Sequence, residues 1–546
     1  MSSPDQRLIG KISDVSSGRF TATLLSDKEG FKPYIQMGLE EIAVGQVGSH
    51  VLIKAKGLQL MTQVLRMWQE ETPNGTVRYI HIMPLGNIGK DGRFARGVNH
   101  YPVLGNEIHM VTNSQLETMF DTFRRDGLHL GRVSQRQALK VYFDSGNLFG
   151  RHLAILGQSG SGKSWAVTSI LQRTVKLMPK AHIVLLDVHG EYGWHDNKGR
   201  MHSAFPSEIV RHVDASELEI PYWLLTYAEL VDLLIDRSDA NASIQIAFMR
   251  EVLFNLRKKA NLDLGADRLS VDSPVFFSIK ELYLQFKKAN EHQLDFGKTH
   301  GPLFGVFDEF LVRFQAMFND SRYDFLFKPK KRTDSEDLEG LLRDFIGLGE
   351  PKRQITVINI SAIPHDVRPT VTAQIGRLVF EFNYWNPKRY DFPILLVCEE
   401  AHQYIPRETD NQHQGTRKAM ERIAKEGRKY GVGLCVVSQR PHDISETVLS
   451  QCANFICLRI TNPDDQNYIR RLMPEGEQDL TDILSSLRRG EALAIGEATP
   501  MPTRFQLYAP DPPPSSHDAP LAKSWRDGPD DIDVSAIVEN WWQQER

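Results

Sequence analysis

The sequence predicts an α/β fold, with a mainly parallel sheet covered by helices, a small β-barrel ahead of it and a helical insertion within it. Three observations carry this prediction. Short alternating strands fill residues 8–112, a glycine-rich loop stands between a strand and a helix at Gly157–Ser164, and strand and helix patterns alternate again after residue 351. The chain has 546 residues, which exceeds one ordinary core and predicts several domains.

The division into domains follows these changes of pattern, and no internal repeat is visible. The predicted parts are an N-terminal β-barrel at 1–112, the first part of the α/β core at 113–219, a helical insertion at 220–350, the second part of the core at 351–508 and a C-terminal arm at 509–546.

The N-terminal part alternates apolar and polar residues in short runs. Turn signals such as Pro73-Asn74-Gly75 and Lys90-Asp91-Gly92 stand between the runs, and this spacing is typical of a small barrel. The expected strands are Leu8–Ile12, Arg19–Leu25, Val51–Ile53, Val77–Met83 and Glu107–Val111, and a short helix is expected from Gln115 through Phe123.

Residues 220–350 have helical periodicity without a strong strand run between the helices. A basic stretch, Phe327–Arg332, is followed at once by the acidic residues of Asp334–Asp337, so a solvated loop is favoured there over a DNA contact. The expected helices are Ala228–Leu234, Ser243–Leu262, Ile279–Asn290 and Glu336–Gly347.

Buried strand patterns occur before the insertion and again after it. Helical stretches at Val371–Asn383 and Thr416–Lys429 alternate with the strands, as in a parallel sheet. The arm is rich in Pro, Asp and Ser and ends in an apolar stretch, Ile532–Trp542, which predicts a mobile arm with a docking segment. The expected strands are His152–Leu156, Ile183–Asp187, Ile355–Ile360, Ile394–Cys398, Gly433–Val437, Phe455–Ile460, Ala492–Ile495 and Arg504–Leu507.

Charge and hydropathy limit the function classes. The net charge is −4, so any nucleic-acid contact must come from a local patch or from the channel of an oligomer. The first residues lack the apolar core of a signal peptide, and no run approaches the ~20 apolar residues of a membrane span. We therefore expect a cytoplasmic protein without a membrane contact.

The cysteines agree with a cytoplasmic location. The chain has four of them, all late in the sequence: Cys398, Cys435, Cys452 and Cys457. Three lie in apolar runs, which predicts reduced core thiols. Cys452 and Cys457 alone cannot form a zinc site, because no nearby Cys or His completes four ligands.

The glycine-rich loop G-Q-S-G-S-G-K-S fits the P-loop pattern, in the strand–loop–helix context that such a loop requires. Its backbone N–H groups can face the phosphates of a nucleoside triphosphate, Lys163 adds a point charge, and Ser164 offers a hydroxyl to Mg²⁺. ATP and Mg²⁺ are therefore the expected cofactors. The candidate nucleotide-binding residues are Gly157, Ser159, Gly160, Ser161, Gly162, Lys163, Ser164 and Trp165.

Two buried strands end in acids. Asp187 closes the strand Ile183–Asp187, where it either points into the nucleotide crevice or caps the following turn; we favour the crevice. The strand Ile394–Cys398 ends in Glu399 and Glu400. We expect Glu399 to hold the Mg²⁺ shell and Glu400 to orient or deprotonate the attacking water.

Further polar residues follow in the second half of the core. Gln439, at the end of a strand in the same crevice, can sense the γ-phosphate, and Arg428, in a helix-to-strand loop, is favoured as an arginine finger for a neighbouring subunit. Arg422 and Lys425 are equally compatible with such a role and with i,i+4 pairing to Glu426 and Glu421.

The motifs together resemble the HerA family of hexameric DNA-translocating ATPases, in the HerA–FtsK superfamily. The resemblance rests on the P-loop, D-V-H-G-E-Y at Asp187–Tyr192, E-E-A-H at Glu399–His402, and the run R-I-A-K-E-G-R-K-Y-G-V-G-L-C-V-V-S-Q-R-P. Further similar stretches are Phe94–Gly105, Ile220–Thr226 and Arg488–Arg504. The resemblance implies a RecA-like P-loop ATPase core.

The resemblance also implies residue roles. Glu399 and Glu400 would form the Walker B pair, Arg428 would act in trans, and Arg151 matches another arginine near the nucleotide. Many P-loop ATPases have Asp first in this pair, which leaves open which acid is the base. The role of Asp187 in its motif stays open, and the polar linker at 407–415 could face the central channel.

The resemblance predicts an ATP-driven DNA translocase or helicase. We expect a homohexamer that works with a separate nuclease or other effector, in DNA-end processing or antiviral defence, with the β-barrel as the docking surface. Two alternatives stay open: a hexameric scaffold that uses ATP to assemble and activate a partner enzyme, and a conjugation-type ATPase.

Overall fold

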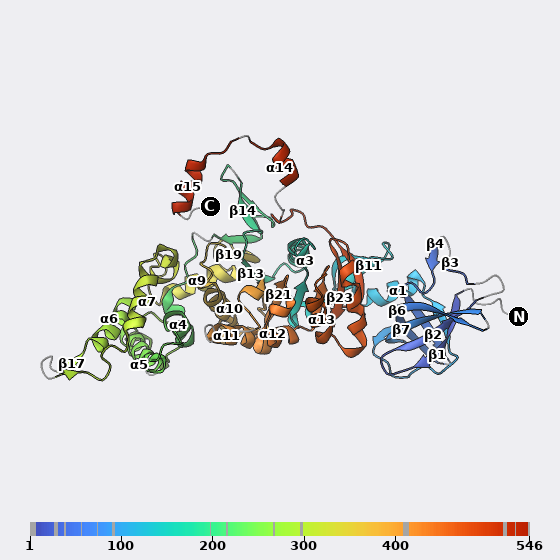
Figure 1. The fold of residues 1–546 in the computed structure, drawn as a ribbon, viewed down its shortest axis with the longest axis horizontal. Coiled ribbons are helices and arrows are strands. Elements are labelled where there is room, and N and C mark those ends of the chain that lie inside the picture. The colour runs from blue at the N-terminus through green and yellow to red at the C-terminus, as the bar shows by residue number, and fades with distance from the viewer. Residues whose placement is uncertain are drawn as a thin grey trace.

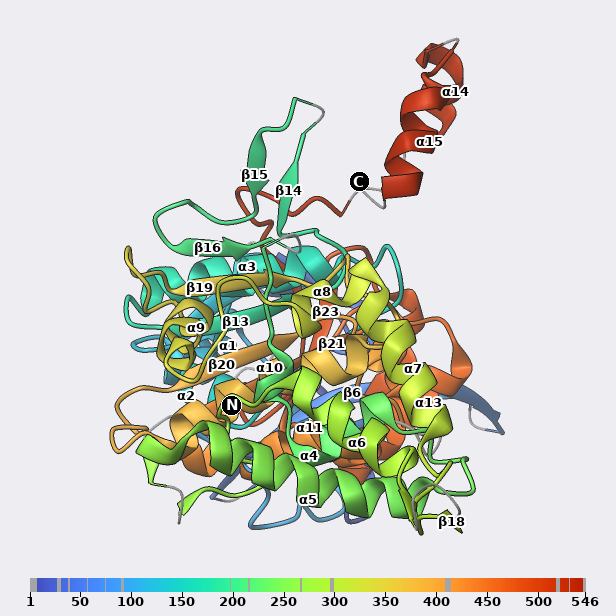
Figure 2. The same cartoon turned by 90° about the vertical axis from the view of Figure 1, so that its left-hand side faces the viewer.

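The computed structural model describes residues 7–26, 31–37, 40–55, 57–73, 75–89, 93–196, 198–214, 217–265, 268–294, 299–407, 414–516, 521–529 and 531–543. Figure 1 shows N-terminal strands at one end of the long axis, a large sheet with its helices in the middle, and a group of helices at the other end. The C-terminal helices stand apart from the body (Figures 1 and 2).

The N-terminal strands form one antiparallel sheet in the order β2-β1-β9-β5-β6-β7-β8, and β2 also pairs with β7, which brings the sheet back to its first strand. Of the hairpin β6–β7, only part of β7 was predicted. Strand β6 was not predicted, because it carries several polar residues. Asn74 of the predicted turn and residues 90–92 lie outside the described residues. The strands are β1 (Leu8–Val15), β2 (Phe20–Leu24), β5 (His50–Ala55), β6 (Leu58–Thr72), β7 (Gly75–Ile88), β8 (Phe94–Arg96) and β9 (Glu107–Met110), with a separate hairpin β3 (Tyr34–Met37) and β4 (Glu40–Ala43).

The central sheet has eleven strands in the order β11-β10-β24-β23-β22-β12-β21-β20-β13-β19-β16. The seven strands from β22 to β16 are parallel, which confirms the predicted parallel-rich α/β core. Most of these strands are continuous apolar runs because helices cover both faces, whereas Arg211 and His212 interrupt the outermost strand, β16. The strands are β10 (Leu128–Val133), β11 (Lys140–Phe143), β12 (Leu153–Leu156), β13 (His182–Asp187), β16 (Val210–Val213), β19 (Ile355–Asn359), β20 (Ile394–Cys398), β21 (Val432–Ser438), β22 (Asn454–Cys457), β23 (Glu491–Gly496) and β24 (Thr503–Leu507).

The parallel pairing decides which loops meet. Strands β12, β21, β20 and β13 are successive neighbours in the sheet, so the segments that follow their carboxyl ends share one edge. In such sheets this edge is where ligands bind. The helices of the core are α1 (Asn113–Phe120), α2 (Ser145–Gly150), α3 (Lys163–Leu177), α10 (Arg368–Trp385), α11 (Gln414–Glu426), α12 (Glu446–Ser450) and α13 (Pro463–Leu472).

Helices fill the segment between β16 and β19. A buried ion pair, Arg377 Nε to Glu229 Oε1 at 3.0 Å, joins these helices to α10 of the core. Helices α7 and α8 were not expected from the sequence. The helices are α4 (Tyr227–Leu234), α5 (Ala242–Ala260), α6 (Ile279–Asn290), α7 (Asp308–Asn319), α8 (Asp324–Phe327) and α9 (Asp337–Ile346), with a two-residue hairpin β17 (Gln293–Leu294) and β18 (Thr299–His300).

After β24 the chain runs along helix α3 and then leaves the body. Helices α14 (Leu521–Asp527) and α15 (Val534–Gln543) project on the same side as the hairpin β14 (Gly193–His195) and β15 (Met201–Ser203), as Figure 2 shows. Both helices expose tryptophan side chains, Trp525 and Trp542 among them. Among the helices of the described residues, none has the length and apolar character needed to cross a membrane.

Candidate active site

The P-loop connects the end of β12 to the start of α3, as predicted, and its glycines are required by geometry. Gly160 and Gly162 have φ of 72° and 101°, in the left-handed region that glycine adopts without strain. A Cβ on Gly157 would lie 2.7 Å from Ser161 Oγ and 2.9 Å from Leu458 Cβ, so no side chain fits there. Helix α3 begins at Lys163, so its N-terminal backbone N–H groups lie next to the loop.

Gln158, inside the loop, ties it to the next strand. Its Oε1 accepts from Thr461 N and Oγ1, at 2.9 and 2.6 Å, just beyond β22. The sequence analysis gave Gln158 no role, because its partners lie 303 residues away. These bonds fix the loop against the edge of the sheet.

Lys163 is the first residue of α3, and its side chain is buried. Its Nζ lies 3.4 Å from the Gln158 carbonyl oxygen. Burial lowers the pKa of Lys163, while the carboxylates of Glu400, Glu399 and Glu191 oppose that shift. The Lys163 ammonium therefore lies close enough to these carboxylates to interact with them electrostatically.

Glu399 directly follows β20, and its side chain is buried. Its Oε1 accepts a hydrogen bond from the Tyr192 hydroxyl at 2.7 Å, whereas the buried Oε2 has no hydrogen-bond partner among the described residues. Burial, and then the nearby Asp187 and Glu191 carboxylates, raise the pKa of Glu399 well above its usual value, against the Tyr192 bond. This oxygen needs a cation or a donor from outside the described residues.

Glu400 lies beside it in an unusual backbone conformation, with φ of 45°. A non-glycine residue pays about 1 kcal/mol or more for this left-handed conformation, which is common at functional sites. Its Oε2 lies 3.3 Å from His402 Nδ1, and the Gln439 backbone N–H donates to its carboxylate. Burial raises the pKa of Glu400, while Lys163 opposes the shift.

His402 and Ser438 were not predicted to belong to the site. His402 Nδ1 lies 3.1 Å from Ser438 Oγ, and burial lowers the pKa of His402 to about 4, so the imidazole is neutral at pH 7. His402 is part of the E-E-A-H motif, but no local feature of the sequence predicts its contact with Ser438 at the end of β21. The structure thus brings Lys163, Glu399, Glu400 and Gln439 to one edge of the sheet.

The Asp187 carboxylate bonds to the loop that follows it, which differs from the crevice role that the sequence favoured. Its Oδ1 accepts from the backbone N–H groups of Gly190 and Glu191, at 2.8 and 3.1 Å, and its Oδ2 accepts from that of Tyr192 at 3.0 Å. These are the bonds of a turn cap, the alternative that the sequence left open. The loop that it closes places Tyr192, which the sequence analysis did not single out, against Glu399.

Arg428 and Arg151 lie at the opposite edge of the sheet. Arg428 is exposed in the turn before β21, and Arg151 lies two residues before β12, where its guanidinium pairs with Glu497 at 2.6 Å. Neither position is at the P-loop edge of its own chain. Arg422 and Lys425 form the i,i+4 pairs with Glu426 and Glu421, at 3.3 and 3.7 Å, that were the alternative to a site role.

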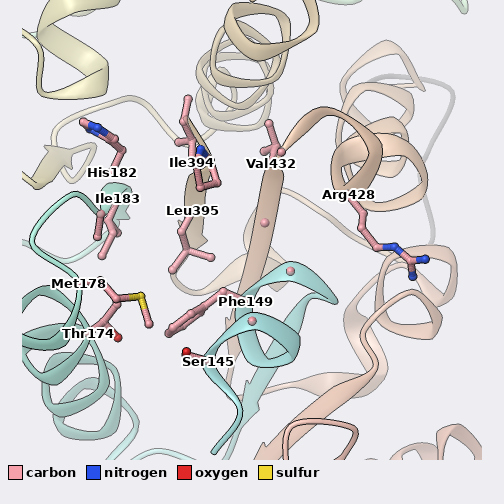
Figure 3. Close-up of a pocket in the computed structure, with 16 residues that line it drawn as sticks. Ser145, Phe149, Thr174, Met178, His182, Ile183, Ile394, Leu395, Arg428 and Val432 are labelled. Carbon is pink, nitrogen blue, oxygen red and sulfur yellow. The ribbon is translucent and has the colours of Figure 1, made fainter. Parts of the chain in front are cut away.

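Figure 3 shows the surroundings of Arg428. An apolar cavity of about 310 Å³ lies between α2, the end of α3 and the amino ends of β13, β20 and β21. Phe149, Met178 and Leu395 point into it, whereas the Arg428 guanidinium lies apart from them. This cavity lies at the opposite ends of the strands from the P-loop and the acid pair Glu399–Glu400.

The residues at the P-loop edge fit a nucleoside triphosphate with Mg²⁺. The glycine cradle, the buried Lys163 and the Oε2 atoms of Glu399 and Glu400, which accept no hydrogen bond from the described residues, are what such a ligand needs. Among the described residues, no group of three or more His, Cys, Asp or Glu side chains could hold a metal ion by itself. A magnesium ion here would depend on phosphate oxygens for most of its ligands.

Comparison with known proteins agrees with this geometry. The family described as "Helicase HerA, central domain" matches residues 128–379, and "Helicase HerA-like C-terminal" matches residues 392–544. The chain belongs to the HerA family. It is an ATPase, as its P-loop and paired acids predict.

Named HerA relatives cover most of the chain. "DNA double-strand break repair helicase HerA" of Sulfolobus acidocaldarius is 28% identical over 458 residues, 83% of this chain and 82% of that protein. The protein of the same name from Pyrococcus furiosus is 27% identical over 439 residues, 75% of this chain and 74% of that protein.

Solved structures outside the HerA name are also similar. VirB4 of Thermoanaerobacter pseudethanolicus is 18% identical with a TM-score of 0.46, over 70% of this chain and 96% of that chain. The plasmid coupling protein TrwB in complex with a GTP analogue is 12% identical with a TM-score of 0.46, over 73% of this chain and 92% of that chain.

Proposed function

We propose that this HerA-family ATPase is a DNA translocase or helicase that works as a homohexameric ring. The observation that carries the proposal is the division of the site. Lys163, Glu399 and Glu400 share one edge of the sheet, whereas Arg428 and Arg151 stand at the opposite edge. Head-to-tail contact between copies would bring the two edges together, and such contacts close into rings.

Each residue then has a defined task. The P-loop backbone, from Gly157 to Ser164, and Trp165 would hold ATP, with Lys163 on the phosphates. Ser164 and Glu399 would hold Mg²⁺, which would neutralise negative charge on the phosphates. Glu400 would orient or deprotonate the attacking water, Gln439 would sense the γ-phosphate, and Arg428 would complete the neighbour's site.

DNA enters this proposal through the family. The curated relatives carry the name of a DNA double-strand break repair helicase. With a net charge of −4, DNA contacts of this chain would come from a local surface such as a ring channel, and phosphate contacts would make binding salt-dependent. The linker at 407–415 is a candidate for that channel, although residues 408–413 lie outside the described residues.

A partner effector is part of the proposal. A nuclease or other enzyme would use the motor in DNA-end processing or antiviral defence, with the N-terminal strands as the docking surface. The pairing of β2 with β7 supports a small β-barrel there. The alternative of an ATP-dependent scaffold needs the same site but only ATP binding.

The test combines ATPase and translocation assays. We expect duplex DNA to raise the ATPase rate several-fold and ATP to drive displacement of a triplex-forming strand. Lys163→Ala should hydrolyse no ATP, and Glu400→Gln should bind ATP but lose about 10² or more in rate. An ATPase indifferent to DNA, with no displacement, would contradict the translocase. A Glu400→Gln protein that fully supports a partner's activity would favour the scaffold.

A further inference from the structure

The D-V-H-G-E-Y segment forms a closed loop directly after β13. The Asp187 carboxylate accepts backbone N–H bonds from Gly190, Glu191 and Tyr192, and Gly190 turns the chain with φ of 72°. A backbone held by several bonds to one buried carboxylate has little freedom. The loop therefore fixes the direction in which Tyr192 leaves it.

The Tyr192 side chain is directed toward the end of the neighbouring strand β20. The side chain is fully buried and its ring is stacked at 7° on Phe205, with the centroids 6.2 Å apart. Because β13 and β20 are adjacent strands, the hydroxyl reaches the Glu399 carboxylate at the end of β20, at 2.7 Å. In this bond the Tyr192 hydroxyl donates and Glu399 Oε1 accepts.

The bond divides the two oxygens of Glu399. Oε1 is occupied by the Tyr192 hydroxyl, and Oε2 is buried without a hydrogen-bond partner among the described residues. A second tyrosine, Tyr404, donates to the backbone carbonyl of Glu399 at 2.7 Å and holds the main chain. The side chain thus has one held oxygen and one available oxygen.

We propose that Tyr192 is a positioning residue that holds one oxygen of Glu399 and thereby aims the other at the metal ion. The inference rests on the proposed role of Glu399 in the Mg²⁺ shell. A hydrogen bond to a metal-binding carboxylate orients that carboxylate toward the metal. Loss of such a hydrogen-bond partner typically costs 10–100-fold in metal affinity or activity. The D-V-H-G-E-Y motif would then support the metal ligand from a neighbouring strand rather than contact the nucleotide.

The test is Tyr192→Phe, which removes only the hydroxyl, studied by binding of Mn²⁺ to the full-length protein with ADP, followed by electron paramagnetic resonance. We expect Mn²⁺ affinity to fall about tenfold or more, while ADP affinity in the absence of divalent metal stays unchanged. Hydrolysis should need correspondingly more Mg²⁺, with a smaller change once Mg²⁺ is saturating.

The controls separate this inference from its premise. Tyr222→Phe makes the same change at another buried tyrosine, whose hydroxyl donates to the Phe277 carbonyl at 2.8 Å far from the site, and should lower thermal stability without changing Mn²⁺ affinity. Wild-type Mn²⁺ affinity in Tyr192→Phe, together with its loss in Glu399→Gln, overturns the positioning role alone. Wild-type affinity in Glu399→Gln overturns the metal assignment and this inference with it.

Discussion

Two buried glutamates of the central sheet differ in their electrostatic surroundings. Burial and neighbouring acids raise the pKa of Glu399. Burial also acts on Glu491, but the bonds from Arg504 to both of its oxygens, at 2.8 and 3.0 Å, and the bond from the Arg488 backbone N–H, at 3.0 Å, together outweigh burial and lower the pKa to about 2. Among the described residues no ion pair is formed by Glu399, whereas Glu491 pairs with Arg504, so of these two carboxylates we expect Glu399 to bind a ligand.

The Glu491 pair predicts a pH dependence of stability. Because the folded pKa of about 2 lies below the ordinary 4.5, this carboxylate stabilises the fold above about pH 4.5 and loses that contribution as the pH falls toward 2. Glu491→Gln should lower the free energy of unfolding by about 2 kcal/mol at pH 7. In urea unfolding, the gap from the wild type should shrink as the pH falls below 4.5. A gap that stays constant from pH 7 to 3 would contradict the assignment.

At the scale of elements, the segment after β24 acts as a strap across the P-loop helix. Gln172 of α3 accepts from Asp511 N and donates to the Pro512 carbonyl, at 3.0 and 2.8 Å. Ser515 N donates to the Glu191 carbonyl at 2.8 Å, next to Tyr192. The strap therefore joins the helix that follows the P-loop to the loop that contacts Glu399.

Two truncations test the strap. Removal of residues 517–546 keeps these bonds and should leave the melting temperature close to that of the full chain. Removal of residues 509–546 loses them, at roughly 1 kcal/mol for each hydrogen bond, and should lower the melting temperature by several degrees. Differential scanning calorimetry of both proteins gives the comparison. Equal melting temperatures would show that the strap adds no stability.

The sequence predicted the elements whose signal is local. The buried parallel strands read as continuous apolar runs, and the P-loop and the acid pair after β20 follow such strands directly. Strands β10 and β16 were missed because polar residues interrupt them at the outer part of the sheet, where burial is incomplete. Helix α7 was missed because its start has no side-chain cap to mark it.

The site was predictable only where one segment carries its own chemistry. Tyr192 and Glu399 are 207 residues apart, and His402 meets Ser438 through the pairing of β20 with β21. Such contacts depend on strand order, which a single sequence does not specify. Asp187 was assigned to the crevice because its place at the end of β13 suits both roles, and only the bonds to the loop decide between them.

At the scale of the whole molecule, the two edges of the sheet carry complementary parts of a proposed site. The P-loop edge has the nucleotide-binding residues and the acids, and the opposite edge has Arg428 and Arg151. Within one copy, buried strands of the sheet separate the two edges along their whole length, so one copy cannot bring them together. A ring of copies with the P-loop edge of one against the Arg428 edge of the next would complete every site.

Mixing two inactive variants tests this account most directly. Lys163→Ala lacks the phosphate contact, and Arg428→Ala lacks the neighbour's arginine, which typically contributes ~10³–10⁵ in rate. Each alone should be nearly inactive. Rings assembled from an equal mixture should recover up to about a quarter of the wild-type ATPase rate, since one interface in four joins an intact P-loop to an intact arginine. Full activity of Arg428→Ala alone, or a mixture no more active than its components, would contradict the shared site.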